Sequence, residues 1–127
     1  MRFRAQGKHH AKDLYSGLIR LHILHHAVEE DIFGLGMIEE LARHGYRLSA
    51  GTLYPQLHQL EEKGLLRSYE QREAGRSRRM YRATVAGQSA LMIAKEKVRE
   101  LFGELFEDKS SLRMPQRPTS SQTRKRK

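Results

Sequence analysis

A change in the spacing of apolar residues limits most strongly how this chain can fold. Up to residue 63 the apolar residues recur every three or four positions, which is the repeat of an amphipathic α-helix. From Leu65 they alternate, as in a half-buried β-strand, and they alternate again over residues 80–83. The polar segment 73–78 between the two runs contains Gly75. Helices followed by one β-hairpin predict a mainly α protein of the α+β class.

The first expected helix covers residues 14–29 and is apolar on two faces. One face carries Leu14, Leu18, Leu21, Leu24 and Val28, whereas Ile19 and Ile23 lie on the opposite side. We expect the leucine face to enter the core and the isoleucine face to meet a partner. A second helix is expected over 34–44, closed by Gly45 in the left-handed conformation that glycine adopts most freely.

The third expected helix runs to Lys63 with Leu53, Leu57 and Leu60 facing inward. Its start has two candidates. With Thr52 as the N-cap, Pro55 falls in the first turn, where its missing N–H costs no hydrogen bond; with Ser49, Pro55 lies deeper and bends the helix.

A long helix is expected from Val85 to about Asp108. Its apolar residues alternate three and four apart, the spacing of a coiled-coil seam, but two heptads are too few for an autonomous coiled coil. Since Phe102 and Phe106 widen the stripe, this helix needs another apolar surface, such as its own copy or the first helix of a second subunit. The expected dimer interface comprises Ile19, Ile23, Leu91, Ala94, Val98, Leu101, Phe102 and Leu105.

Three helices followed by a two-stranded wing is the element order of a winged helix-turn-helix, in which the third helix enters the DNA major groove. The expected organisation is a disordered basic arm (1–12), a winged helix-turn-helix (13–83), a C-terminal dimerisation helix (84–108) and a disordered basic tail (109–127).

The positive charge of the chain is concentrated at its two ends. The net charge is +9, but residues 1–12 and 109–127 together hold eleven Lys or Arg and no acid, which leaves residues 13–108 with a net charge of −2. Any nucleic-acid surface on the folded part must therefore be local. The local patch is the arginine cluster of residues 72–82, where five arginines accompany one acid, Glu73.

The outward face of the third helix carries short donors and acceptors, and the wing carries arginines. Gln and His can read base edges, whereas Ser, Thr and Tyr more often hold the phosphate backbone. Arginines at the wing suit phosphate or a narrow minor groove. The expected DNA-binding residues are Ser49, Gly51, Thr52, Tyr54, Pro55, Gln56, His58, Gln59, Arg76, Arg78 and Arg79.

A longer string within the third helix resembles a known family. Ser49-Ala50-Gly51-Thr52-Leu53-Tyr54-Pro55, followed by Leu57, Leu60, Glu61, Gly64, Leu65 and Leu66, is similar to the recognition-helix signature of PadR regulators, with Ala50 where proline is usual. Residues 80–87 resemble the family's Y-x-L-T-x-x-G, with Ala83 in place of leucine. Gly34 matches the glycine that opens the second helix, but Leu35 stands where the family often has tyrosine.

The resemblance spans about residues 14–106 and implies a homodimer joined through its first and last helices. It also implies a palindromic double-stranded DNA operator and repression relieved by a small aromatic or hydrophobic effector. No cofactor is expected.

Seven histidines, three of them close together on the first helix, raise an alternative. His22 and His26 are one turn apart with Glu29 on the same face, so the three could hold a transition metal in a metal-responsive repressor. Packing of the two histidines beside a dimer contact is the simpler interpretation, and no metal site is assigned.

Other classes of protein fit less well. The chain has no cysteine, which excludes a thiolate zinc site or a cysteine nucleophile and fits a reducing, cytoplasmic location. No signal peptide or membrane span is expected. No catalytic constellation is evident, so an enzyme is not expected. The net charge of −2 between the ends keeps open a protein–protein adaptor that uses the same fold without binding DNA.

Overall fold

The computed structural model describes the backbone of residues 2–107 and the side chains of residues 14–106. The predicted basic tail, residues 109–127, lies outside the described residues. The chain forms two compact units, Met1–Leu91 and the segment from Met92 onward. The elements in order are α1 (Arg2–Glu29), β1 (Ile32–Phe33), α2 (Gly34–Arg43), α3 (Ala50–Glu62), β2 (Leu66–Glu73), β3 (Arg76–Ala83), α4 (Val85–Phe102) and a π-helical turn (Gly103–Glu107).

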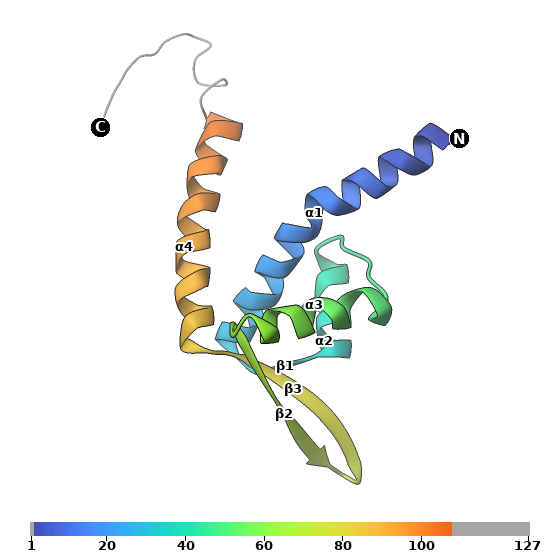
Figure 1. Cartoon of the computed structure of the whole chain (residues 1–127), viewed down its shortest axis with the longest axis vertical. Helices are drawn as coiled ribbons and strands as arrows, with labels where there is room; N and C mark the ends of the chain where they lie inside the picture. Colours follow the sequence, from blue (N-terminus) through green and yellow to red (C-terminus); the bar gives the residue numbers. More distant parts are fainter. Residues whose placement is uncertain (1, 108–127) are drawn as a thin grey trace. The chain divides into compact units, whose positions relative to one another are not determined.

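The first unit is a winged helix-turn-helix, as the order of the sequence patterns predicts. Helices α1, α2 and α3 accompany a three-stranded antiparallel sheet of order β1-β3-β2, in which β1 comes between α1 and α2 in the chain; β2 and β3 follow α3 and form a hairpin that extends beyond the helices (Figure 1). The short strand β1 pairs with the base of β3, Ile32 opposite Tyr81.

Helix α1 begins at Arg2, where an irregular arm was expected over residues 1–12. This stretch contains no proline and is rich in Ala, Arg, Lys and Gln, all good helix formers. Once the helix of residues 14–29 is in place, each further turn adds a hydrogen bond per residue without a new nucleation cost, so the helix extends backward.

The core of the first unit is built from every one of its elements. Helix α1 contributes four buried side chains, α2 two, α3 three, and the strands and α4 complete it. The core residues are Ile19, Ile23, Leu24, Ala27, Ile32, Met37, Leu41, Leu53, Leu57, Leu60, Leu66, Tyr81 and Leu91.

The predicted orientation of α1 was wrong for its isoleucine face and only partly right for its leucine face, of which Leu24 is buried and Leu21 packs against the core. Ile19 and Ile23, expected at a partner surface, are 6% and 0% exposed in the core, whereas Leu14 and Leu18 are 75% and 46% exposed. Both faces of this helix are apolar, so the period alone could not determine which one the domain buries. The β-branched stripe continues through Ala27, whose small side chain allows close packing against the neighbouring elements.

The start of α4 is fixed to the end of α3 by a short hydrogen-bonded link. The Thr84 hydroxyl donates to the Gly64 carbonyl oxygen (2.6 Å) and accepts from the Gly87 N–H (3.0 Å), which caps the helix. A Cβ at Gly87 would lie 2.2 Å from the Leu65 carbonyl oxygen, so only glycine fits there. The beginning of α4 thus belongs to the winged-helix unit, although the sequence placed the boundary at residues 83–84.

Leu91 is 8% exposed in the first unit, so it is not available as the predicted interface residue. Apart from Ile19 and Ile23, the remaining predicted interface positions lie in the second unit, where Val98, Leu101, Phe102 and Leu105 are exposed and Ala94 is half-buried. In the part of the chain described by the structure, no helix is both long and apolar enough to cross a lipid bilayer.

Candidate nucleic-acid interface

Helix α3 is positioned by three fully buried leucines and presents a polar outer face. Leu53 and Leu57 are 0% exposed and Leu60 is 5% exposed, which confirms the predicted inward stripe. Consequently most residues predicted to contact DNA are solvent-exposed: Ser49, Gly51, Thr52, Pro55, His58 and Gln59.

Of the two candidate starts of α3, the structure has Ser49 as the N-cap. The Thr52 and Leu53 N–H groups both donate to the Ser49 carbonyl oxygen, at 3.1 and 3.0 Å, while the Ser49 side chain makes no capping hydrogen bond. Pro55 therefore lies inside the helix. The first N–H groups of a helix have no partner within it, and they attract anions such as phosphate.

Gln56 does not lie on the outer face with its neighbours. Its side chain is half-buried, and its Oε1 atom is buried without a hydrogen-bond partner among the described residues. An acceptor in that position cannot read a base edge without first swinging outward, so Gln56 fits the predicted role poorly.

The side chain of Tyr54, on α3, packs against the beginning of α2. A Cβ built on Gly34 would lie 2.0 Å from the Tyr54 hydroxyl oxygen, so the tyrosine ring occupies the space that any other residue at position 34 would need. This contact gives a physical reason for a glycine at position 34, which the sequence analysis noted only from the family resemblance. Tyr54 is half-buried and also lines a cleft between α3 and the hairpin.

The hairpin is longer and its turn tighter than predicted. The polar segment 73–78, expected as a loop, is mostly paired strand: Glu73 lies opposite Arg76, and only Ala74 and Gly75 form the turn. Both turn residues have positive φ, 53° and 76°, as a two-residue hairpin turn requires. Arg76, Arg78 and Arg79 consequently lie on strand β3 and are exposed.

Two polar contacts hold the hairpin at its base. Asp31, between α1 and β1, accepts hydrogen bonds from the Tyr69 hydroxyl and from Arg82 Nη2, the latter at 3.1 Å. These two hydrogen bonds, Tyr69 first, lower the pKa of Asp31, and the same contact raises the pKa of Tyr69. The charge of Arg82, one of the predicted basic patch, is therefore compensated.

The second contact links β2 to α3. The Ser68 hydroxyl and N–H both donate to Glu61 Oε2, at 2.8 and 3.3 Å, and Arg79 Nη1 donates to the Ser68 hydroxyl at 3.2 Å. The sequence analysis noted Glu61 only as part of the motif that resembles the family signature. In the structure, its carboxylate links α3 to strand β2 of the hairpin.

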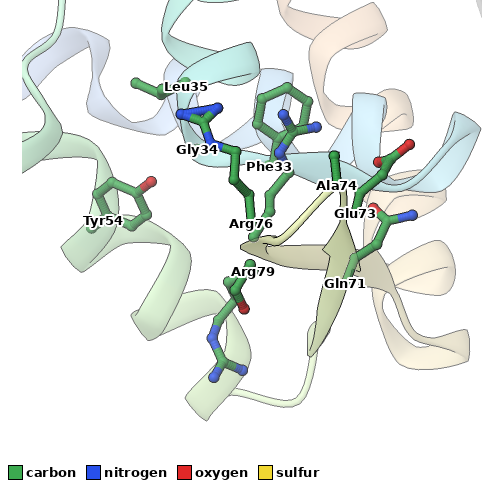
Figure 2. Close-up of a pocket in the computed structure, with 11 residues that line it drawn as sticks. Phe33, Gly34, Leu35, Tyr54, Gln71, Glu73, Ala74, Arg76 and Arg79 are labelled. Carbon is green, nitrogen blue, oxygen red and sulfur yellow. The ribbon is translucent and has the colours of Figure 1, made fainter.

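A cleft of about 640 Å³ separates α3 from the hairpin and brings the predicted residues Tyr54, Arg76, Arg78 and Arg79 together (Figure 2). Phe33 and Gln71, which the sequence did not single out, also line it, as does Leu35, noted before only as a departure from the family pattern. The Arg78 guanidinium lies 4.0 Å from the centre of the Phe33 ring, a cation–π contact that holds it against β1. Leu35 is 64% exposed at the rim. Polar, positively charged walls suit a polyanion better than an apolar small molecule.

The histidines predicted as metal-ligand candidates lie on α1, which contributes none of the residues lining this cleft. His22 and His26 do come together, but Glu29 is not grouped with them; the third member of their group is His44, at the end of α2.

Comparisons with known proteins agree with this geometry. The family model "Transcriptional regulator PadR-like family" matches residues 23–93. The chain is similar to the transcriptional regulator Rv3488 of Mycobacterium tuberculosis, with 47% identity over 95 residues, which cover 75% of this chain and 89% of that protein.

Solved structures give the same result. The structure of a PadR family regulator from Eggerthella lenta superposes with a TM-score of 0.70 at 28% identity, covering 84% of this chain and 97% of that one. The transcriptional regulator TA0346 from Thermoplasma acidophilum superposes with a TM-score of 0.62 at 26% identity, covering 76% and 97%.

Proposed function

Because this chain belongs to the PadR-like family, which comprises transcriptional regulators rather than enzymes, we propose that it is a sequence-specific repressor. In this proposal it acts in the cytoplasm as a homodimer on a palindromic operator and is released by a small hydrophobic or aromatic effector. The observation that carries the DNA-binding part is the cleft in which Tyr54 of α3 and three arginines of β3 meet.

The two sides of the cleft have different tasks in this proposal. His58 and Gln59 on α3 are exposed and carry groups that can pair with base edges in the major groove. Ser49 and Thr52, at the start of the helix, hold phosphate together with the helix N–H groups. The wing arginines bind phosphate or enter the minor groove beside it.

Dimerisation is supported by apolar surface in the second unit. Several large exposed apolar side chains gathered in one short segment are typical of a surface that associates with another. The Phe102 and Phe106 rings lie 4.9 Å apart and face solvent together. The exposed apolar residues there are Met92, Ile93, Val98, Leu101, Phe102, Leu105 and Phe106.

Selection of bound fragments from the source genome, followed by footprinting, tests the proposal. We expect a symmetric site whose two halves lie about one helical turn, roughly 34 Å, apart. Sedimentation of the free protein should give the mass of two chains. If no fragment competes better than random DNA at moderate salt, the fold serves another purpose, such as protein–protein adaptation.

A further inference from the structure

A second group of chemically active side chains lies on the first unit, between α1 and the end of α2. We propose that His22, His26 and His44, with Glu40, form a binding site for a divalent transition-metal ion of the zinc class. In the part of the chain that the structure describes, the three histidines are the only group of three or more metal-ligand side chains drawn together in this way.

The four side chains come from two helices, each of which contributes a pair one turn apart. His22 and His26 are an i,i+4 pair on α1, and Glu40 and His44 are an i,i+4 pair on α2 and its C-cap. Ligand atoms of the three histidines lie within 4.8 Å of one another. Glu40 Oε2 lies 3.5 Å from His26 Nε2 and 3.3 Å from His44 Nε2.

These separations suit a shared ion. Ligands bound tetrahedrally to zinc at about 2.0–2.1 Å lie roughly 3.4 Å from one another. The two Glu40 distances already have this size, whereas the histidine ligand atoms, which lie within 4.8 Å of one another, would have to draw closer to share an ion; Glu40 is near His26 and His44 but is not a member of the histidine group. Three imidazoles and one carboxylate favour Zn²⁺, Co²⁺, Ni²⁺ or Cu²⁺ over Mg²⁺ or Ca²⁺, which prefer all-oxygen sites.

The surroundings also favour an ion. Arg43 pairs with Glu40 Oε1 and leaves Oε2 facing the histidines, the kind of outer contact that orients a metal-bound carboxylate. The His22 and His44 rings stack at 4.6 Å, and His44 is 44% exposed, which leaves a path from solvent.

The competing explanation is aromatic packing alone, since the Tyr46 ring meets His22 edge-on at 5.4 Å. A metal-binding measurement on the full-length protein separates the two, and it is independent of the proposed DNA-binding function. The chelator-treated protein is titrated with Co²⁺, whose tetrahedral complexes absorb strongly in the visible region, and then with competing Zn²⁺. We expect one ion per chain, a higher melting temperature with Zn²⁺, and no change with Mg²⁺.

Variants locate the site. We expect His44→Ala to weaken binding by a hundredfold or more and Glu40→Gln by roughly tenfold. The matched control is His25→Ala, a change of an exposed histidine on the same helix that is outside the group. A second control, His9→Ala with His10→Ala, removes the two histidines near the start of the chain.

Circular dichroism of each metal-free variant shows whether it is folded. If His44→Ala does not fold, the Co²⁺ spectrum of His26→Ala, a ligand on the other helix, decides instead. The proposal is overturned if the wild type retains no stoichiometric ion, if folded His44→Ala or His26→Ala binds as tightly as wild type, or if the control variants lose binding equally.

Discussion

Helix α3 and the β2–β3 hairpin border the same cleft, but different forces hold them in place. Three leucines that are 5% exposed or less anchor α3 in the core. The hairpin buries only residues at its base, Leu66, Met80 and Tyr81, and its outer half is exposed on both strands. It depends instead on the polar contacts of Asp31 and Glu61.

The difference matches what each element would do in the proposed function. Reading a base edge requires side chains held within fractions of an ångström, which a packed helix provides. Neutralising phosphate requires only positive charge at short range, so arginines on an exposed hairpin suffice and can follow the shape of the DNA. Four substitutions test whether α3, held by apolar packing, reads the bases while the hairpin, held by polar contacts, binds phosphate.

The largest effect is expected from Leu57→Ala, which removes a fully buried side chain beneath α3. Truncation of a buried leucine leaves a cavity, and we expect a loss of about 2–5 kcal/mol in the free energy of unfolding, with DNA binding lost as α3 loosens. Urea denaturation measures the change. His58→Ala, on the exposed side of the same helix, should leave stability nearly unaltered; equal losses would contradict a packed α3.

Replacing Arg76, Arg78 and Arg79 together by alanine should weaken binding to every DNA sequence while the fold remains intact. We expect the log–log dependence of affinity on salt to become shallower by about 2–3, because each phosphate contact contributes about 0.9 to the slope. Fluorescence anisotropy at several salt concentrations measures it. The triple lysine variant keeps the charge and should keep the slope. An unchanged slope in the alanine variant would mean that the hairpin arginines do not bind phosphate.

Gln59→Ala should act on specificity rather than on general affinity. We expect operator binding to lose about 1–3 kcal/mol relative to random DNA, the value of a good side-chain contact to a base. Competition assays with both DNAs give this difference. Glu62→Gln, one turn further on the exposed face and not assigned to DNA, is the control; parallel loss on both DNAs in Gln59→Ala would mean that the reading face lies elsewhere.

The smallest effect is expected from Asp31→Asn, which weakens the link between β1 and the hairpin. Since the folded state lowers the pKa of Asp31, the stability that its carboxylate contributes is present at neutral pH and lost as the pH falls below about 4. The wild type should therefore be slightly more stable than Asp31→Asn at pH 7, and the difference should shrink as the pH falls below about 4. Denaturation across this pH range tests this, and a difference that does not change with pH would point to packing instead of charge.

The parts of the fold that could be predicted are those in which one apolar stripe faces one core. Helices α2 and α3 each have such a stripe, and the leucines of α3 also determine which polar residues face outward. Helix α1 has two stripes, so its period was clear and its orientation was not. The choice depends on side chains from distant parts of the chain, such as Met37 and Leu53, which a local pattern does not contain.

The candidate site was predictable where helix geometry alone determines which side chains are exposed. It was not predictable where contacts between distant parts of the chain determine the position of a side chain. Gln56 fits the polar face by spacing but is half-buried. The Ala74–Gly75 turn lacks the Asn-Gly signal of a two-residue hairpin turn, so a longer loop was expected. Glu40 and His44 lie 14 and 18 residues after His26 in the sequence, and only the packing of α2 against α1 brings them to His22 and His26.

The close approach of Gly34 to Tyr54 bears on protein engineering. Recognition helices are natural modules to exchange between relatives when a new operator preference is wanted. Here the transplanted module cannot stop at the ends of α3, because a tyrosine at position 54 requires an empty space at position 34. A chimera that imports Tyr54 into a host with a side chain at position 34 would displace the tyrosine ring from its place against α2, so the two positions are best exchanged as a pair.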